Sequence, residues 1–166
     1  MKLTKGTIYY PKNRKSQPVK WLCVSAHQDD CEIMAIDGIL KGYYSRKYSF
    51  ALIETTDGAG SSRKGEFKDC SDEDMKKIRI LEQQQAGEIG KYNAIYMLNY
   101  SSQEAKDERN QQIEEDYLEI IRNLKPQIIY THSILDKHPT HVAVALKLIK
   151  ALRKLPKEER PKLVYG

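Results

Sequence analysis

The chain of 166 residues lacks several features that would assign it to a familiar class. No apolar run approaches the roughly 18 residues of a transmembrane helix, so we expect no membrane span. The N-terminus leads into no apolar segment of the kind found in secretion signals. There are only three cysteines, none in Cys-x-x-Cys spacing, which disfavours a disulfide framework and a zinc ribbon. We therefore expect a cytoplasmic protein with reduced thiols.

Glycine-rich phosphate-binding signatures are missing as well. No Gly-x-Gly-x-x-Gly follows the first apolar run, and the Gly- and Ser-rich segment 55–70 lacks the Gly-Lys-Ser/Thr ending of a P-loop. The net charge is +5, but the 28 Lys and Arg residues are dispersed among 23 acids. This pattern favours a solvated surface over a nucleic-acid footprint, so we expect no nucleic-acid partner.

What the chain does have is a regular alternation of apolar runs and amphipathic segments. We expect strands at 20–26, 49–54, 93–98 and 127–131, and the opening of a fifth at 162–165. We expect helices at 30–44, 71–90, around 113–124 and at 139–155, with irregular segments at 1–20, 55–70, 101–110 and 132–137. In the first helix, one face carries Ile33, Ile36, Ile39 and Leu40.

This order of elements predicts one α/β domain over residues 1–166. The fold class is a Rossmann-like, doubly wound, mostly parallel sheet in a three-layer α/β/α architecture. The chain stops where the fifth strand begins, which leaves open that the domain continues and that its C-terminal part is lacking here.

The segment His27-Gln28-Asp29-Asp30-Cys31-Glu32 follows directly on the apolar run at 21–24. One imidazole and three carboxylates thus crowd at the exit of a strand, where ligands and metals collect in α/β sheets. Grouping so many ionisable side chains beside a core is unfavourable unless something compensates, and a bound cation would do so.

A second cluster, Asp136-Lys137-His138-Pro139-Thr140-His141, lies between the fourth strand and the fourth helix. His138 and His141 are three residues apart and can face one direction. We expect the first and fourth strands to be neighbours, which would bring His27 and His141 together. Two histidines and one aspartate with an open fourth position are typical of catalytic zinc, although the same ligands also accept Fe²⁺.

The two clusters resemble motifs of one known family. His27-Gln28-Asp29-Asp30-Cys31-Glu32 resembles the His-Pro-Asp-Asp-x-Glu motif of the LmbE-like (PIG-L) N-acetylglucosaminyl deacetylases, and His138-Pro139-Thr140-His141 resembles their His-Pro-Asp-His motif. The Arg79-x-x-Glu82 pair and the loop 55–60 also fit, so the resemblance extends over about residues 20–166.

The resemblance implies a zinc-dependent hydrolase that removes acetyl from an N-acetylated amino sugar or sugar conjugate. The metal ligands it implies are His27, Asp30 and His141. Asp29 would be the general base and then the acid, and His138 would stabilise the oxyanion. Supporting or substrate-facing roles fall to Glu32, Asp136, Arg79 and Glu82.

Some alternatives stay open at this stage. Gln28 stands where the family has proline and Thr140 where it has aspartate, and the chain is shorter than is usual in the family. A non-catalytic or weakly active member that binds metal and sugar is therefore the alternative function. Read alone, Asp29 or Asp30 could cap the first helix, and Arg79 could simply pair with Glu82. The exact substrate and a homo-oligomeric state are also left open.

Overall fold

A six-stranded sheet forms the centre of the protein in the computed structural model, which describes residues 3–166. The strand order is β1-β4-β3-β2-β5-β6, with β1 antiparallel to β4 and every other pair parallel. The strands are β1 (Thr7–Tyr9), β2 (Val19–Ser25), β3 (Ser49–Thr56), β4 (Ile95–Tyr100), β5 (Ile128–Tyr130) and β6 (Leu163–Tyr165).

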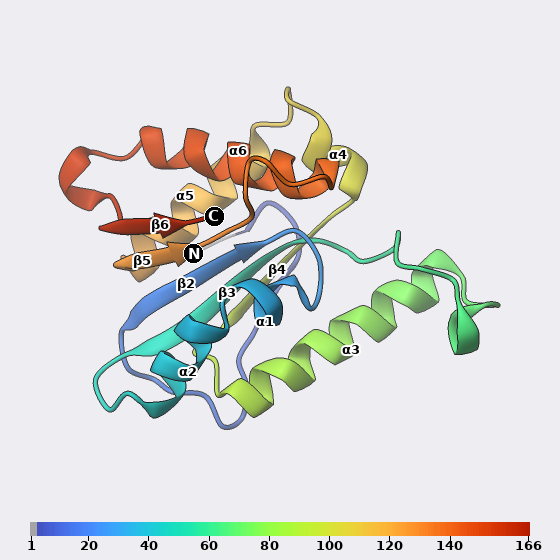
Figure 1. The fold of residues 1–166 in the computed structure, drawn as a ribbon, viewed down its shortest axis with the longest axis horizontal. Helices are drawn as coiled ribbons and strands as arrows, with labels where there is room; N and C mark the ends of the chain where they lie inside the picture. Colours follow the sequence, from blue (N-terminus) through green and yellow to red (C-terminus); the bar gives the residue numbers. More distant parts are fainter. Residues whose placement is uncertain (1–2) are drawn as a thin grey trace.

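Helices cover both faces of the sheet (Figure 1). One face carries α1 (Asp30–Met34), α2 (Ile36–Tyr44) and α3 (Asp72–Gly90), and the other carries α4 (Ser102–Lys106), α5 (Gln112–Leu124) and α6 (Pro139–Arg153). Two short 3₁₀ turns lie at Gly65–Phe67 and Lys157–Glu159. The predicted three-layer α/β/α fold is confirmed. Over residues 3–166, none of the helices combines the length and the apolar character needed to cross a bilayer.

The central strands β2 and β3 are mainly apolar because both of their faces are buried, and the polar residues at the end of β3, such as Glu54, are buried too. In β2, Leu22 and Val24 belong to the core beneath α5 and α6, whereas Trp21 and Cys23 belong to the core beneath α1 and α2. Successive side chains of a strand point to opposite faces, so a strand between two helical layers favours apolar residues on both faces.

Two elements in segments that we expected to be irregular are regular in the structure. β1 lies within the predicted lead-in 1–20 and pairs with β4, but three residues are too few for a periodic pattern to reveal. α4 lies within the predicted loop 101–110. Its start was readable, because the hydroxyl of Ser101 and the carboxylate of Glu104 form a capping box.

The predicted helix at 30–44 is wrong in two respects. It is interrupted at Ala35, whose backbone ends α1 and begins α2. Its buried stripe is made of small residues around Ile39, whereas Ile33 is 77% exposed and Ile36 and Leu40 are about half exposed. The small stripe lets α2 lie close to the sheet, and this leaves the larger apolar side chains on the outside.

Gly42 shows how close that approach is, and it yields a test of the packing. A Cβ atom at this position would lie 2.7 Å from the Cβ and 2.9 Å from the backbone nitrogen of Phe50 in β3. We expect Gly42→Ala to lower the free energy of unfolding by about 1–3 kcal/mol because β3 cannot move away. Denaturant unfolding measures this, with Gly60→Ala as the control, since nothing lies within 4 Å of the Cβ built there. Equal midpoints for the two variants would contradict the proposed contact.

Candidate functional site

The parallel pairing of β2 with β5 brings the two predicted clusters to the same edge of the sheet. Cys23 pairs with Tyr130, so the loops that leave both strands emerge side by side. The first loop carries His27 to Asp29 and leads into α1 at Asp30, and the second leads through Asp136 to the start of α6. The predicted strands at 20–26 and 127–131 are β2 and β5, and the prediction that they are neighbours is confirmed.

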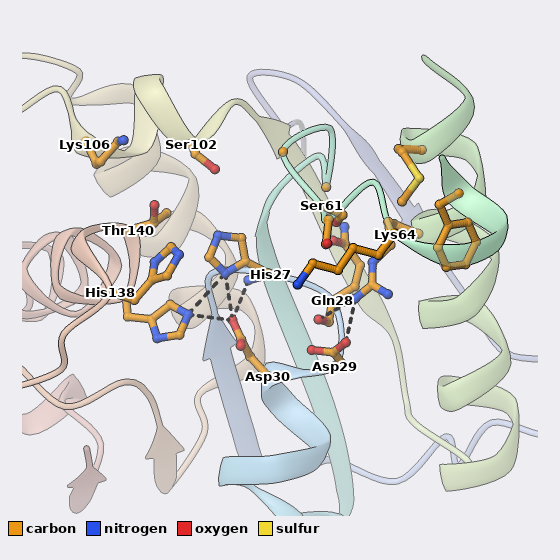
Figure 2. A pocket seen from close by; sticks show the side chains of 17 residues that line it. His27, Gln28, Asp29, Asp30, Ser61, Lys64, Ser102, Lys106, His138 and Thr140 are labelled. Carbon is orange, nitrogen blue, oxygen red and sulfur yellow. Dashed lines mark hydrogen bonds and ion pairs between the residues drawn. The ribbon is translucent and has the colours of Figure 1, made fainter. Parts of the chain in front are cut away.

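Three potential ligand atoms form a nearly equilateral triangle at this edge (Figure 2). Nδ1 of His27 lies 3.2 Å from Oδ2 of Asp30 and 3.2 Å from Nε2 of His141, and the latter two atoms lie 3.4 Å apart. Ligands held about 2.0–2.1 Å from a tetrahedral zinc ion are about 3.3 Å from one another. The donor set and its spacing therefore fit a zinc ion, and other divalent metals accept the same ligands.

The neighbours of this triangle orient His141 and favour the ionised carboxylates of Asp30 and Asp136. Nδ1 of His141 lies 3.0 Å from Oδ2 of Asp136, which leaves Nε2 directed at the triangle. The backbone N–H of His138 and the ring of His141 lower the pKa of Asp136 to about 2. Burial raises the pKa of Asp30, but hydrogen bonds from the side chain and backbone N–H of His27 outweigh it and leave that pKa lowered.

His132 is a site residue that the sequence reasoning missed. It is buried, its ring stacks on His141 with centroids 3.9 Å apart, and its Nε2 accepts a hydrogen bond of 2.8 Å from the backbone N–H of Ala26. Burial lowers the pKa of His132 to about 4, so the ring is neutral. The same Nε2 lies 3.4 Å from Oδ2 of Asp30, so His132 contacts the triangle at Asp30 as well as at His141. The sequence did hold one signal for His132. It lies just after β5, as His27 lies just after β2.

Asp29 diverges from Asp30 because its backbone is left-handed, with φ of 72°. Its Oδ2 lies 2.7 Å from Nη2 of Arg79, and its backbone N–H donates to Oε1 of Gln83. Arg79 also donates to the carbonyl oxygen of Gln28 and to Glu82. Arg79 is therefore not a simple surface partner of Glu82, because it holds the turn that presents Asp29.

Glu32 and Glu82 lie behind this turn rather than in the main cavity. Glu32 accepts hydrogen bonds from the hydroxyl of Tyr92 and from Gln83, at 2.7 and 2.9 Å. Through Gln83 it reaches the backbone of Asp29. Both glutamates line a smaller cavity of about 320 Å³ on the far side of Arg79.

Gln28, at the position of the family's proline, fastens the same turn to β3. Its buried side chain donates to the carboxyl group of Glu54 and to the carbonyl oxygen of Thr56. Burial raises the pKa of Glu54 well above its usual range. Gly58, at φ of +74°, packs against this amide, since a Cβ there would lie 2.6 Å from Oε1 of Gln28. A proline at residue 28 could not make these bonds.

The triangle and Asp29 open into a main cavity of about 800 Å³. Its other walls come from the loop between β3 and α3, from α4 and from the first turn of α6 (Figure 2). His138 lies on the α6 wall, with its ring 4.9 Å from that of His27, centroid to centroid. Thr140, in place of the family's aspartate, lines the cavity but is almost fully buried.

Comparisons with known proteins agree with the motifs. The family model described as PIG-L: GlcNAc-PI de-N-acetylase matches residues 22–152. A comparison with curated protein sequences gave no significant match.

Several solved structures share the fold. An N,N'-diacetylchitobiose deacetylase from Pyrococcus horikoshii, complexed with its inhibitor MPG, superposes with a TM-score of 0.70 at 22% identity, over 88% of this chain and 54% of its own. A conserved protein from Thermus thermophilus gives 0.68 at 19% identity, over 88% and 64%. The 4-carboxy-2-hydroxymuconate hydratase GalB of Pseudomonas putida gives 0.64 at 20% identity, over 89% and 62%.

These structural likenesses establish the fold alone. The chain spans between about half and two thirds of the length of each of these three proteins. Since one of them is a deacetylase and another a hydratase, the chemistry has to be argued from the site.

The buried Glu54 predicts a particular dependence of stability on pH. Its pKa is raised in the folded chain above the usual 4.5, so the unfolded chain releases this proton first as the pH rises. Protonated Glu54 therefore contributes its full stabilisation of the fold below pH 4.5. This contribution is lost as the pH rises through the raised pKa that Glu54 has in the folded chain. Glu54→Gln cannot ionise, so its stability relative to the parent should grow by up to about 1.4 kcal/mol per pH unit across that window.

Denaturant unfolding of chelator-treated protein between about pH 4.5 and pH 8 measures this difference. Glu119→Gln, on the exposed side of α5, controls for the loss of one negative charge. Parallel stability curves for Glu54→Gln and the parent would contradict the raised pKa.

Proposed function

Because the chain belongs to the PIG-L family, we propose that it is a metal-dependent hydrolase that removes acetyl from an N-acetylated amino sugar or sugar conjugate. The observation that carries the proposal is the triangle of His27, Asp30 and His141, with Asp29 lining the same cavity. A deacetylase among the proteins of the same fold supports the same reaction class.

In this proposal His27, Asp30 and His141 hold the metal, with Asp136 and His132 fixing the orientation of His141. Zn²⁺ is the first candidate and Fe²⁺ the second, because both accept two imidazoles and a carboxylate. A divalent metal bound there polarises the amide carbonyl and lowers the pKa of water toward 7, which supplies a nucleophile at neutral pH.

Asp29 is the general base and then the general acid. Its Oδ2 is engaged by Arg79, and within residues 3–166 Oδ1 has no hydrogen-bond donor, so this oxygen can receive a proton. Asp29 takes the proton from the attacking water as the new C–O bond forms. It then delivers a proton to the amide nitrogen as the C–N bond breaks, which yields acetate and a free amine.

His138 stabilises the negative charge that develops on the carbonyl oxygen. It stands at the N-cap of α6, on the wall of the cavity beside His27. Burial, followed by the charges of His141 and His27, lowers the pKa of His138. The neutral ring still has one N–H to donate, and a fixed donor at this point is worth several kcal/mol in acyl-transfer reactions.

The metal site can be tested without a substrate. Elemental analysis of dialysed protein should find about one zinc per chain in the parent and a loss of most of it in His141→Ala, because one of three protein ligands is removed. Lys137→Ala, an exposed change in the same loop, should keep the metal. A parent that takes up no metal when zinc is offered would contradict the proposal.

The role of Asp29 predicts a defect in chemistry rather than in metal binding. On any N-acetyl substrate that the parent cleaves, Asp29→Asn should lower kcat by about 100-fold or more while the zinc content stays at the parent level. Release of acetate measures the rate. Glu119→Gln is the control for charge. An Asp29→Asn variant with the parent's kcat would contradict the assignment of Asp29 as the general base. A parent that binds sugar but never releases acetate would favour the non-catalytic alternative.

A further inference from the structure

One wall of the main cavity is the loop between β3 and α3, residues 57–71. Figure 2 shows Ser61 and Lys64 of this loop on the opposite side of His27 from His138. The position of the loop therefore sets how wide the cavity is. The residues that it contributes to the lining are Gly58, Gly60, Ser61, Ser62, Lys64 and Phe67.

The backbone of this loop does little to fix its own position. The N–H of Ser61 donates to the carbonyl oxygen of Gly58, and three further backbone bonds in segment 64–70 join residues three apart. Within residues 3–166, no backbone–backbone hydrogen bond joins the first limb of the loop, 58–62, to the second limb, 64–71. An ion pair of Asp57 with Lys76 of α3 fixes only the base of the loop.

The side chain of Arg63 joins the two limbs. Its Nη1 and Nη2 donate to the carbonyl oxygens of Ser61 and Ala59 in the first limb. Its Nε donates to the carbonyl oxygen of Cys70 in the second limb, at 3.0 Å, and Nη2 also lies 2.7 Å from Oδ1 of Asp72 at the start of α3. A planar guanidinium group has enough donors, in a fixed fork, to bind all four partners at once.

The contacts of Arg63 are internal to the loop, so its charge is not directed at a ligand. Arg63 is not among the residues that line the cavity, although its neighbours on both sides are. The carboxylate of Asp72 is 78% exposed, and exposed ion pairs contribute little. The three carbonyl contacts therefore carry the link, and their loss would leave those oxygens without a donor and let the limbs separate.

We propose that Arg63 is a positioning residue for substrate binding, because it holds this loop as the wall that contacts the part of the substrate beyond the N-acetyl group. The inference rests on the proposed deacetylase function and assigns recognition of that part to a loop outside the metal triangle. Within residues 3–166, Phe67 supplies the only phenyl ring that lines the cavity, and its apolar surface suits a ring attached to the sugar.

Two probes test this role with the zinc-loaded protein, the small methyl N-acetylglucosaminide and the extended 4-nitrophenyl N-acetylglucosaminide. Arg63→Gln should raise KM for the extended probe roughly 10-fold, and KM for the small probe less, because the attached ring depends most on the displaced wall. We expect kcat to stay within about threefold of the parent's value, since the triangle and Asp29 lie on other elements. Release of acetate measures the rates, and elemental analysis should find the parent's zinc content.

Matched variants separate the shape of the guanidinium group from its charge. Arg109→Gln removes the same charge from a side chain that is 92% exposed and does not line the cavity, so it should keep the parent's KM. Asp72→Asn should also keep it, because the three carbonyl contacts of Arg63 remain. Arg63→Lys retains the charge but not the fork, so it should resemble Arg63→Gln. Methylguanidinium added to Arg63→Ala should lower the raised KM toward the parent's value.

Unchanged KM for both probes in Arg63→Gln, a fall in kcat alone, or a loss of zinc overturns the positioning role and leaves the proposed function standing. If the parent releases no acetate, the proposed function fails for these probes, and calorimetric binding to the zinc-loaded protein decides the inference. Weaker binding of the extended probe by Arg63→Ala, restored by methylguanidinium, supports the positioning role. Equal binding by the variant and the parent, or no binding by the parent, overturns it.

Discussion

Parallel pairing between β2 and β5 is the contact on which the site depends. It sets the exits of two strands side by side, although His27 and His141 are 114 residues apart in the chain. The pairing is itself supported across the site, because the backbone N–H of Ala26 after β2 donates to His132 after β5. The same histidine stacks on His141. The register of the sheet and the geometry of the triangle are therefore one arrangement, and neither can shift without the other.

Buried polar side chains beneath the turn at residues 28–30 also fix the position of that turn. Gln28 ties the turn to Glu54 in β3, while Gln83 and Arg79 tie it to α3. These hydrogen bonds favour one position of the turn over others, while Oε1 of Gln28, Oε2 of Glu54 and Nε of Arg79 stay buried with no hydrogen-bond partner within residues 3–166. The aspartate that we propose as the base is thus positioned by hydrogen bonds from its turn to β3 and α3.

The sequence predicted the parts of this protein that depend on local pattern and failed where packing decided. The helix expected at 71–90 is present as α3, Asp72–Gly90, and begins at a capping box formed by Ser71 and Asp74. The exposure of Ile33 was not readable, because an apolar stripe at helical spacing does not reveal that small residues on another face approach the sheet. His132 carries no motif of its own, so its contact with His141 emerged only from the fold. The partner of Gln28, Glu54, lies 26 residues away on another strand.

The left-handed backbone of Asp29 places conformational strain at the residue that we propose as the base. A non-glycine residue held in this region is strained by about 1 kcal/mol or more, and the surrounding hydrogen bonds must overcome that strain. Selection of variants for heat resistance alone would therefore favour glycine at position 29, and each step toward a hardier protein at this position would discard the carboxylate. With Asp29 as the base that we propose, stability and activity are in opposition at this residue, so thermostable versions of the protein should be sought through changes elsewhere.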